Sequence, residues 1–157
     1  SISNEKIIRL NDFINNAFSV EGKGPIVQLR NIKKIKKIDN LNIPHVQIYS
    51  KKTLPPEFHF KTPSLGDYLL VAEPGWMIFS DKDFNENIST LKGMHGYAPH
   101  HDKMHGIFYA YGPNFIAGKK IETFELIHIY PMLCNILNIN PNMNIDGKLN
   151  VLKSIIK

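Results

Sequence analysis

The sequence predicts one α/β domain in which strands and short helices form a layered core. A chain of 157 residues that is 43% hydrophobic has the size and composition of a single core-forming domain. Two short runs, 67–72 and 107–110, are apolar at successive positions, as strands covered on both faces are. Helical patterns are interspersed with the strand-like runs, so a layered α/β architecture is expected.

The first half of the chain predicts three strands. Residues 20–30 read as a glycine-containing turn that leads into a strand, and residues 45–49 alternate apolar and polar side chains as a second strand does. Pro55 and Pro56 then interrupt regular pairing. The run 67–72 follows as the first buried strand, and Pro74-Gly75 ends it.

The second half predicts further strands and two helices. A returning strand is expected over 76–79, a loop over 81–92, and a second buried strand of the same sheet over 107–110. Residues 125–130 again follow a strand-like pattern. Pro131 suits the first position of a helix that ends near residues 138–141, and a short helix is expected over 151–156.

The charge distribution and the cysteine content argue against nucleic-acid binding and against an internal disulfide. The net charge of +5 comes from residues 1–60, largely from four lysines between residues 33 and 37, where isoleucines at 32, 35 and 38 predict a short amphipathic helix. Because no arginine or aromatic residue is interleaved there, we expect a solvated face and no nucleic-acid binding. Cys134 is the only cysteine, which excludes an internal disulfide, and its apolar neighbours predict a buried side chain.

The ends of the chain and its hydropathy add two expectations. No run of eighteen apolar residues occurs, so no transmembrane segment is expected in this chain. The chain starts at Ser1 without an initiator methionine or the layout of a signal peptide, so we expect that the start was cut from a longer protein.

Three stretches, taken in order, carry a family resemblance. The first comprises 45–49, Leu54-Pro55 and 66–76; the second is Gly93-Met94-His95-Gly96-Tyr97 with Met104 and the 107–115 segment; the third comprises 124–125 and 129–137. Together they resemble the nucleotide pyrophosphatase/phosphodiesterase family of the alkaline phosphatase superfamily. This resemblance implies an α/β/α layered domain with a mostly buried sheet. Residues 1–157 would form a single segment, the C-terminal part of that catalytic domain, with the upstream half absent.

The resemblance also implies the chemistry. The family uses two Zn²⁺ ions held by Asp and His side chains, and a threonine nucleophile. All but one of these groups would belong upstream of Ser1, so no catalytic residue is expected in this segment. The remaining group is His95, which the resemblance makes a ligand of the zinc that activates water in the second half-reaction.

The residues around His95 are compatible with that role. A histidine between glycines, on a loop between strands, leaves backbone room for a metal and offers a neutral imidazole. Without the resemblance, the same features describe an ordinary loop histidine. His100, His101 and His105 lie on the same loop beside Lys103, and we expect them to be exposed polar residues. Ala98 stands where the family commonly has Asp, which removes a carboxylate that could orient His95.

The expected function is hydrolysis of a phosphodiester or pyrophosphate bond by the complete metal-dependent enzyme, with the 157-residue chain inactive alone. Nucleotide and phospholipid-type substrates are not separated by this segment. The partners expected are the upstream half of the same domain and the substrate. The resemblance favours an extracellular, periplasmic or membrane-anchored location. The alternative is a non-catalytic binding module or scaffold on the same fold, and Ala98 is the residue that supports it.

Overall fold

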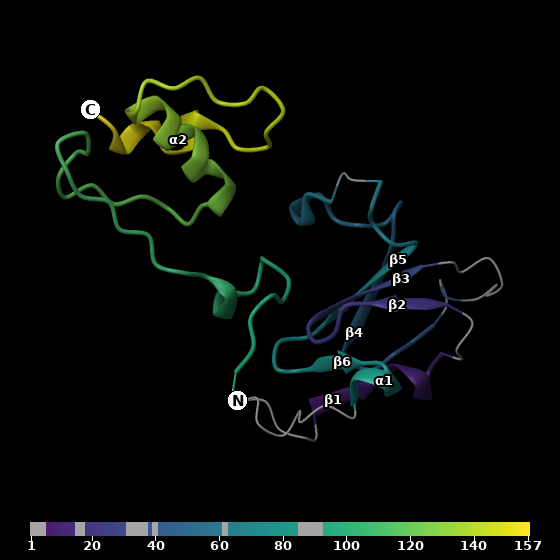
Figure 1. The fold of residues 1–157 in the computed structure, drawn as a ribbon. Coiled ribbons are helices and arrows are strands. Elements are labelled where there is room, and N and C mark those ends of the chain that lie inside the picture. Colours follow the sequence, from purple (N-terminus) through teal and green to yellow (C-terminus); the bar gives the residue numbers. More distant parts are fainter. Residues whose placement is uncertain (1–5, 15–17, 31–37, 39–40, 61–62, 85–92) are drawn as a thin grey trace. The chain divides into compact units, whose positions relative to one another are not determined.

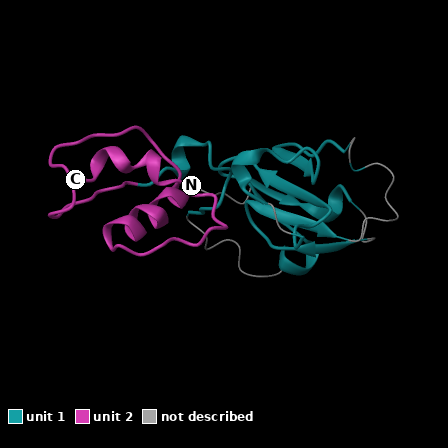
Figure 2. Ribbon diagram, turned by 90° about the horizontal axis from the view of Figure 1, so that it is seen from above, with its two compact units in different colours: residues 1–106 teal, residues 107–157 magenta. Residues whose placement is uncertain are grey.

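The computed structural model of the chain describes residues 6–14, 18–30, 38, 41–60, 63–84 and 93–157. The chain forms two compact units, residues 1–106 and residues 107–157, which are coloured separately in Figure 2. We call them the sheet unit and the C-terminal unit. Each has buried hydrophobic side chains of its own, so each can be understood from its own contacts.

The sheet unit contains a four-stranded antiparallel sheet in the order β2-β3-β5-β4 (Figure 1). Its strands are β2 (Ser19–Glu21), β3 (Ile26–Arg30), β4 (Val46–Ser50) and β5 (Tyr68–Ala72). A parallel pair, β1 (Ile7–Arg9) and β6 (Met77–Phe79), is joined to it where Gly24 and Ile78 exchange two backbone hydrogen bonds of 2.8 Å. The strands expected near residues 26–30, 45–49 and 67–72 are confirmed, and the returning strand is β6, paired with β1.

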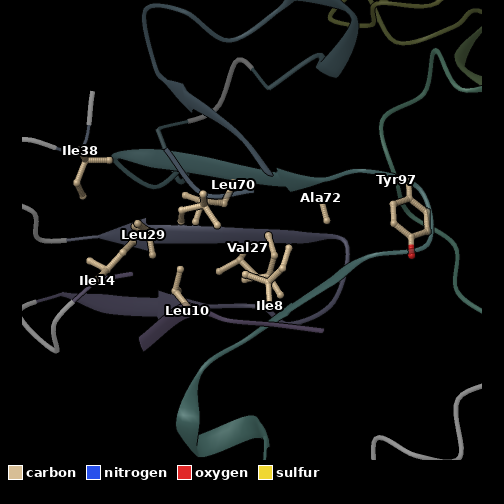
Figure 3. Close-up of a cluster of buried hydrophobic side chains, with 11 residues drawn as sticks. Ile8, Leu10, Ile14, Val27, Leu29, Ile38, Leu70, Ala72 and Tyr97 are labelled. Atoms are coloured by element: carbon tan, nitrogen blue, oxygen red, sulfur yellow. The ribbon is translucent and has the colours of Figure 1, made fainter. Parts of the chain in front are cut away.

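β5 lies between β3 and β4 and is covered on both faces. Leu70 and Ala72 belong to a large cluster on one face, shown in Figure 3. Leu69 and Val71, which point to the other face, belong to a small cluster. The buried members of the large cluster are Ile8, Leu10, Ile14, Val27, Leu29, Ile38, Ile43, Leu70, Ala72, Ile78 and Tyr97; those of the small cluster are Leu65, Leu69, Val71 and Ala98. All four residues from 69 to 72 are 3% exposed or less, which confirms the first buried strand.

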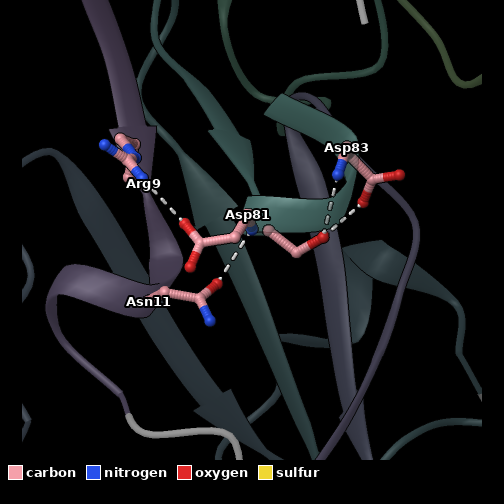
Figure 4. A network of polar contacts seen from close by, with 5 residues as sticks. Arg9, Asn11, Asp81 and Asp83 are labelled. Carbon is pink, nitrogen blue, oxygen red and sulfur yellow. Dashed lines mark hydrogen bonds and ion pairs between the residues drawn. The ribbon is translucent and has the colours of Figure 1, made fainter. Parts of the chain in front are cut away.

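A polar network joins β1 to the segment after β6 (Figure 4). Arg9 pairs with Asp81 at 3.0 Å, and the Asp81 backbone N–H donates to the Asn11 side chain, also at 3.0 Å. The Ser80 hydroxyl donates to Asp83 at 2.6 Å and accepts from the Asp83 N–H, as an N-terminal cap does. These contacts start the helical turn α1 (Asp81–Phe84), so the loop expected over 81–92 is wrong for its first four residues. Residues 85–92 lie outside the described part.

The C-terminal unit is built around one helix, α2 (Ile129–Ile136). Met132 from this helix packs with Leu152 and Ile155, and these three side chains are 5% exposed or less. The described 3₁₀ turns of the two units are Leu10–Asp12, Pro56–Phe58, Asp102–Met104, Leu126–His128, Leu149–Val151 and Lys153–Ile155. The final helix expected over 151–156 is therefore a pair of 3₁₀ turns that begins at residue 149.

The second buried strand, expected over 107–110, is wrong. Ile107 is 100% exposed and Tyr109 83% exposed, and no described strand pairs with this segment. Phe108 packs into the cluster of the C-terminal unit and meets Phe124 edge to face, with ring centroids 4.9 Å apart. Only one side of this segment is covered. A strand buried on both faces needs paired strands and packing partners on each face, and the described residues do not provide them here.

The strand expected over 125–130 is also wrong. A 3₁₀ turn over Leu126–His128 leads directly into α2, which begins at Ile129. Pro131 is therefore the third residue of the helix, where its missing N–H still costs no helical hydrogen bond. The helix therefore begins at Ile129, two residues before the expected start at Pro131.

Three remaining expectations have mixed outcomes. Cys134 is 6% exposed, which confirms a buried small side chain. The lysine-rich helix expected around residues 33–37 lies outside the described residues. In the described part of the chain, we find no helix with the length and apolar character needed to cross a membrane.

Candidate metal-ligand loop

His95 is exposed between two residues that pack against the sheet. Met94 is half-buried against the large cluster, and Tyr97 is a buried member of that cluster, 6% exposed. His95 and Gly96 between them are exposed. Gly96 has a φ of +88°, a left-handed conformation that glycine adopts without strain. The backbone thus displays His95 to solvent between two apolar contacts.

The space beside His95 is open on both sides along the chain. A Cβ atom built on Gly93 or Gly96 would meet no described heavy atom within 4 Å. The loop is therefore uncrowded at both glycines near His95. The expected glycine environment of His95 is present.

Tyr97 and Ala98 hold the loop to the sheet. Tyr97 packs in the large cluster and Ala98, 2% exposed, in the small cluster. The Tyr97 hydroxyl makes no hydrogen bond of ordinary geometry with the described residues. Burial raises the pKa of this phenol, and the nearby backbone of Gly75 offsets part of the rise. The contribution of Tyr97 to the loop therefore comes from packing of its ring.

A zinc site needs several ligating side chains close together. No group of three or more His, Cys, Asp or Glu side chains in this part of the chain could hold a metal ion. Zinc in catalytic sites commonly has three protein ligands and one open position. The described residues therefore do not form a zinc site by themselves, and His95 is at most one ligand of such a site.

The neighbouring histidines differ from His95 in their surroundings. His100 and His105 are exposed, as expected, whereas His101 is half-buried. The rings of His100 and His101 lie 4.4 Å apart. His101 lines an open pocket of about 530 Å³ whose lining includes Glu73, Asp102 and Lys103 but not His95. The three histidines and His95 thus do not form one ligand set.

Sequence reasoning missed a polar cluster at the end of the β4–β5 pair. The His45 imidazole stacks on Trp76 with ring centroids 3.9 Å apart, and its Nδ1 lies 2.7 Å from the Glu73 carboxylate. His45 has a φ of +62°, which a non-glycine residue adopts only when its surroundings hold it. The pairing of Val46 with Ala72 puts residues 45 and 73 opposite each other. In the sequence, His45 and Glu73 are 28 positions apart, and their contact becomes visible only once this register is known.

The comparisons with known proteins agree with this geometry. Residues 1–98 match the model of the type I phosphodiesterase/nucleotide pyrophosphatase family. Bis(5'-adenosyl)-triphosphatase enpp4 of Xenopus laevis is 36% identical over 159 aligned residues, which cover 98% of this chain and 34% of that protein. Ectonucleotide pyrophosphatase/phosphodiesterase family member 7 of the mouse is 31% identical, with 73% of this chain and 25% of that protein covered.

A solved structure shows the same fold. Human ectonucleotide pyrophosphatase/phosphodiesterase 5 superposes with a TM-score of 0.81 at 25% identity, over 99% of this chain and 42% of that one. The α/β class and the alkaline-phosphatase-like fold are thereby confirmed. The chain spans between a quarter and about a third of the length of the first curated relatives and matches part of a larger domain. Since the family model covers residues 1–98, including the loop that carries His95, the chain belongs to the type I phosphodiesterase/nucleotide pyrophosphatase family.

Proposed function

We propose that this chain is the C-terminal part of a metal-dependent phosphodiesterase or nucleotide pyrophosphatase, in which His95 ligates one of two zinc ions. The observation that carries the proposal is the exposed His95 between two open glycines, on a loop held to the sheet, within the residues that match the family. An exposed imidazole can offer one ring nitrogen to a metal.

In the complete enzyme, two bound zinc ions would stabilise the attacking and leaving oxygens of an in-line displacement at phosphorus. This chain's own contribution is to present the His95 imidazole. Gly93 and Gly96 leave space for the ligands of the other half, and Tyr97 keeps the loop against the large cluster. The nucleophile and the remaining ligands would come from the upstream half of the domain.

The substrate class follows from the relatives. Those named above are called a bis(5'-adenosyl)-triphosphatase and an ectonucleotide pyrophosphatase/phosphodiesterase family member. We therefore propose a phosphodiester or pyrophosphate bond as the one hydrolysed, with nucleotides as the first substrates to test. The prefix "ecto" in the name of the second relative supports an extracellular or ectodomain location.

The test of His95 requires a complete catalytic domain, made by joining this chain to the upstream part of the Xenopus laevis relative. We expect two zinc ions per domain by metal analysis. His95→Ala should remove one zinc and reduce turnover of a nitrophenyl phosphodiester by at least tenfold, while the circular dichroism spectrum stays unchanged. His100→Ala and His105→Ala are matched controls, because both side chains are exposed histidines of the same loop.

Two outcomes would contradict the ligand assignment. One is unchanged zinc content in His95→Ala together with loss of zinc in a control variant. The other is hydrolysis of the phosphodiester by the 157-residue chain alone, which should be inactive because it lacks the proposed nucleophile.

A non-catalytic binding module is the second candidate, and Ala98 favours it. The methyl group of Ala98 is buried among apolar residues, so no carboxylate at this position supports His95. A complete domain that binds no zinc under saturating conditions would support the module. Two bound zinc ions would support the enzyme.

A further inference from the structure

His95 is attached to the sheet by the two residues that follow Gly96. Tyr97 and Ala98 are consecutive, both are buried, and they belong to different clusters. The large cluster contains Leu70 and Ala72, whereas the small cluster contains Leu69 and Val71. Because side chains alternate along a strand, the two clusters lie on opposite faces of the sheet. The chain is therefore fixed on both faces within two residues, and we call this pair the Tyr97–Ala98 anchor.

The anchor crosses the sheet at the end of β5. Ala98 lines a pocket together with Val71, Ala72 and Pro74, which are the last residues of β5 and the start of the turn after it. The Tyr97 phenol lies near the backbone of Gly75 in the same turn. Figure 3 shows the Tyr97 ring beyond Ala72, at this end of the strand. The loop is thus tied to β5, the strand that is covered on both faces.

The residue directly before His95 is also packed against the sheet unit. Met94 packs against the large cluster, so the chain touches this cluster at residues 94 and 97 and leaves it at 95 and 96. His95 precedes Tyr97 by two residues, a reach of about 7 Å for an extended chain. A short tether between two packed positions restricts where the imidazole can lie, which is the condition for precise metal ligation.

We propose that Tyr97 and Ala98 are positioning residues for His95, acting through apolar burial on the two faces of the sheet. This rests on the proposed function, in which His95 is a metal ligand. The ring of Tyr97 provides the effect, since its hydroxyl makes no ordinary hydrogen bond with the described residues. The methyl of Ala98 fits a cluster formed by Leu65, Leu69 and Val71, into which a charged group would carry a large desolvation cost.

The test compares Tyr97→Ala, Tyr97→Phe and Ala98→Lys in the complete catalytic domain described above, because a lysine brings a charge into the small cluster without supplying a carboxylate that could orient His95. The dissociation constant for zinc is measured by competition with a chelator, and amide hydrogen exchange is followed over residues 93–98. Tyr97→Ala and Ala98→Lys should weaken the zinc that His95→Ala removes by about 10- to 100-fold, as loss of support behind a ligand does. Both should also speed exchange in the loop. Tyr97→Phe should keep zinc affinity within about threefold of the unsubstituted domain, because the ring remains.

Leu10→Ala is the matched control. Leu10 is a member of the large cluster, 1% exposed, and lies outside residues 93–98. Its truncation lowers stability without removing either residue of the anchor. Zinc affinity in Leu10→Ala should stay unchanged. Equal weakening of zinc by Leu10→Ala and Tyr97→Ala would overturn the proposal, as would unchanged zinc affinity and exchange in both Tyr97→Ala and Ala98→Lys.

Failure of the anchor and failure of the proposed function give different results. If His95→Ala leaves the zinc content unchanged, the ligand assignment fails, whatever the exchange data show. If His95→Ala removes zinc but Tyr97→Ala does not weaken it, only the anchor fails. If Tyr97→Ala does not fold, Tyr97→Leu replaces it, because leucine keeps part of the apolar contact. Tyr97→Leu should give an intermediate zinc affinity. A zinc affinity equal to that of Tyr97→Phe would contradict the role proposed for the aromatic ring.

Discussion

Ile78 and Ile107 are the same residue type in the two units, yet Ile78 is 0% exposed and Ile107 is 100% exposed. Ile78 lies in β6, where the strand pairs with β1 and exchanges hydrogen bonds with Gly24. Ile107 begins an extended segment for which the described residues provide no strand partner. The two residues therefore differ in what surrounds them, not in their own chemistry.

The comparison shows what burial of an apolar run requires. In the sheet unit, β5 has a strand on each side and a cluster on each face, so four successive apolar residues are all buried. In the C-terminal unit, one helix and a few 3₁₀ turns cover Phe108, while Tyr109 and Tyr111 stay more than 80% exposed. An apolar run thus becomes a buried strand only where the chain also supplies the neighbours.

The largest expected effect compares Ile78→Ala with Ile107→Ala in the 157-residue chain. Truncation of a fully buried isoleucine removes contacts and leaves a cavity, so Ile78→Ala should lower the free energy of unfolding by about 2–5 kcal/mol. Ile107→Ala should change it by less than about 0.5 kcal/mol, because an exposed side chain loses no contact. Urea unfolding followed by fluorescence of Trp76, the only tryptophan and a residue of the sheet unit, gives the first value.

The same two variants also test whether Ile107 is exposed in solution. Hydrogen exchange of the α2 amides measures how much Ile107→Ala changes the stability of the C-terminal unit. A loss of protection comparable with that caused by Ile78→Ala in the sheet unit would mean that residue 107 is buried in solution. Repeating Ile107→Ala in the complete domain then measures how much cover the other half of the domain gives this residue.

The parts of the fold that could be predicted are those set by local pattern and nearby turns. β3, β4 and β5 each have a strand pattern bounded by glycine or proline, and they pair with each other. The run at 107–110 has the same pattern, but its burial depends on a distant partner. The strand expected over 125–130 is wrong because apolar residues at the start of a helix can have the pattern of a short strand over six positions.

The candidate site was less predictable than the sheet. His95 was singled out by its resemblance to a motif, since a loop histidine between glycines has no distinguishing physical pattern. Its support by Tyr97 and Ala98 depends on which clusters these residues enter, and that is decided by packing across the sheet. The contact between His45 and Glu73 similarly required the β4–β5 register.

A medium effect is expected from Gly147→Ala in the C-terminal unit. A Cβ atom at this position would lie 2.2 Å from the carbonyl oxygen of Ile127, and the next residue, Lys148, donates its N–H to the His128 ring at 3.0 Å. The loop must therefore move away from the start of α2, which should cost about 1–3 kcal/mol, as overpacking does. Hydrogen exchange of the α2 amides should show reduced protection.

Gly93→Ala is the control for this prediction. Its Cβ would meet no described heavy atom within 4 Å, so exchange protection should hardly change. Equal effects from the two substitutions would show that backbone flexibility, and not the close approach to Ile127, explains the result.

The smallest expected effect concerns Tyr49 of β4 and appears only at alkaline pH. Burial raises the pKa of its phenol above the usual value of 10.0, and the Glu57 carboxylate raises it further. The unfolded chain therefore loses this proton at a lower pH than the folded chain. The contribution to stability is present below about pH 10 and is lost as the pH rises through the raised pKa of the folded state.

Tyr49→Phe should remove this alkaline loss. The hydroxyl donates to the Gln47 side chain, and a hydrogen bond of this kind is worth about 1 kcal/mol, so stability at pH 7 should fall by no more than that. Above pH 10, the substituted chain should lose less stability than the original, as measured by urea midpoints followed through Trp76 fluorescence. Glu57→Gln removes the smaller cause of the raised pKa and should shift the curve less. If the pH profile of Tyr49→Phe matched the original, the alkaline loss of stability would come from another titrating group. The Tyr49 phenol would then be less buried in solution than its packing against Phe58 indicates.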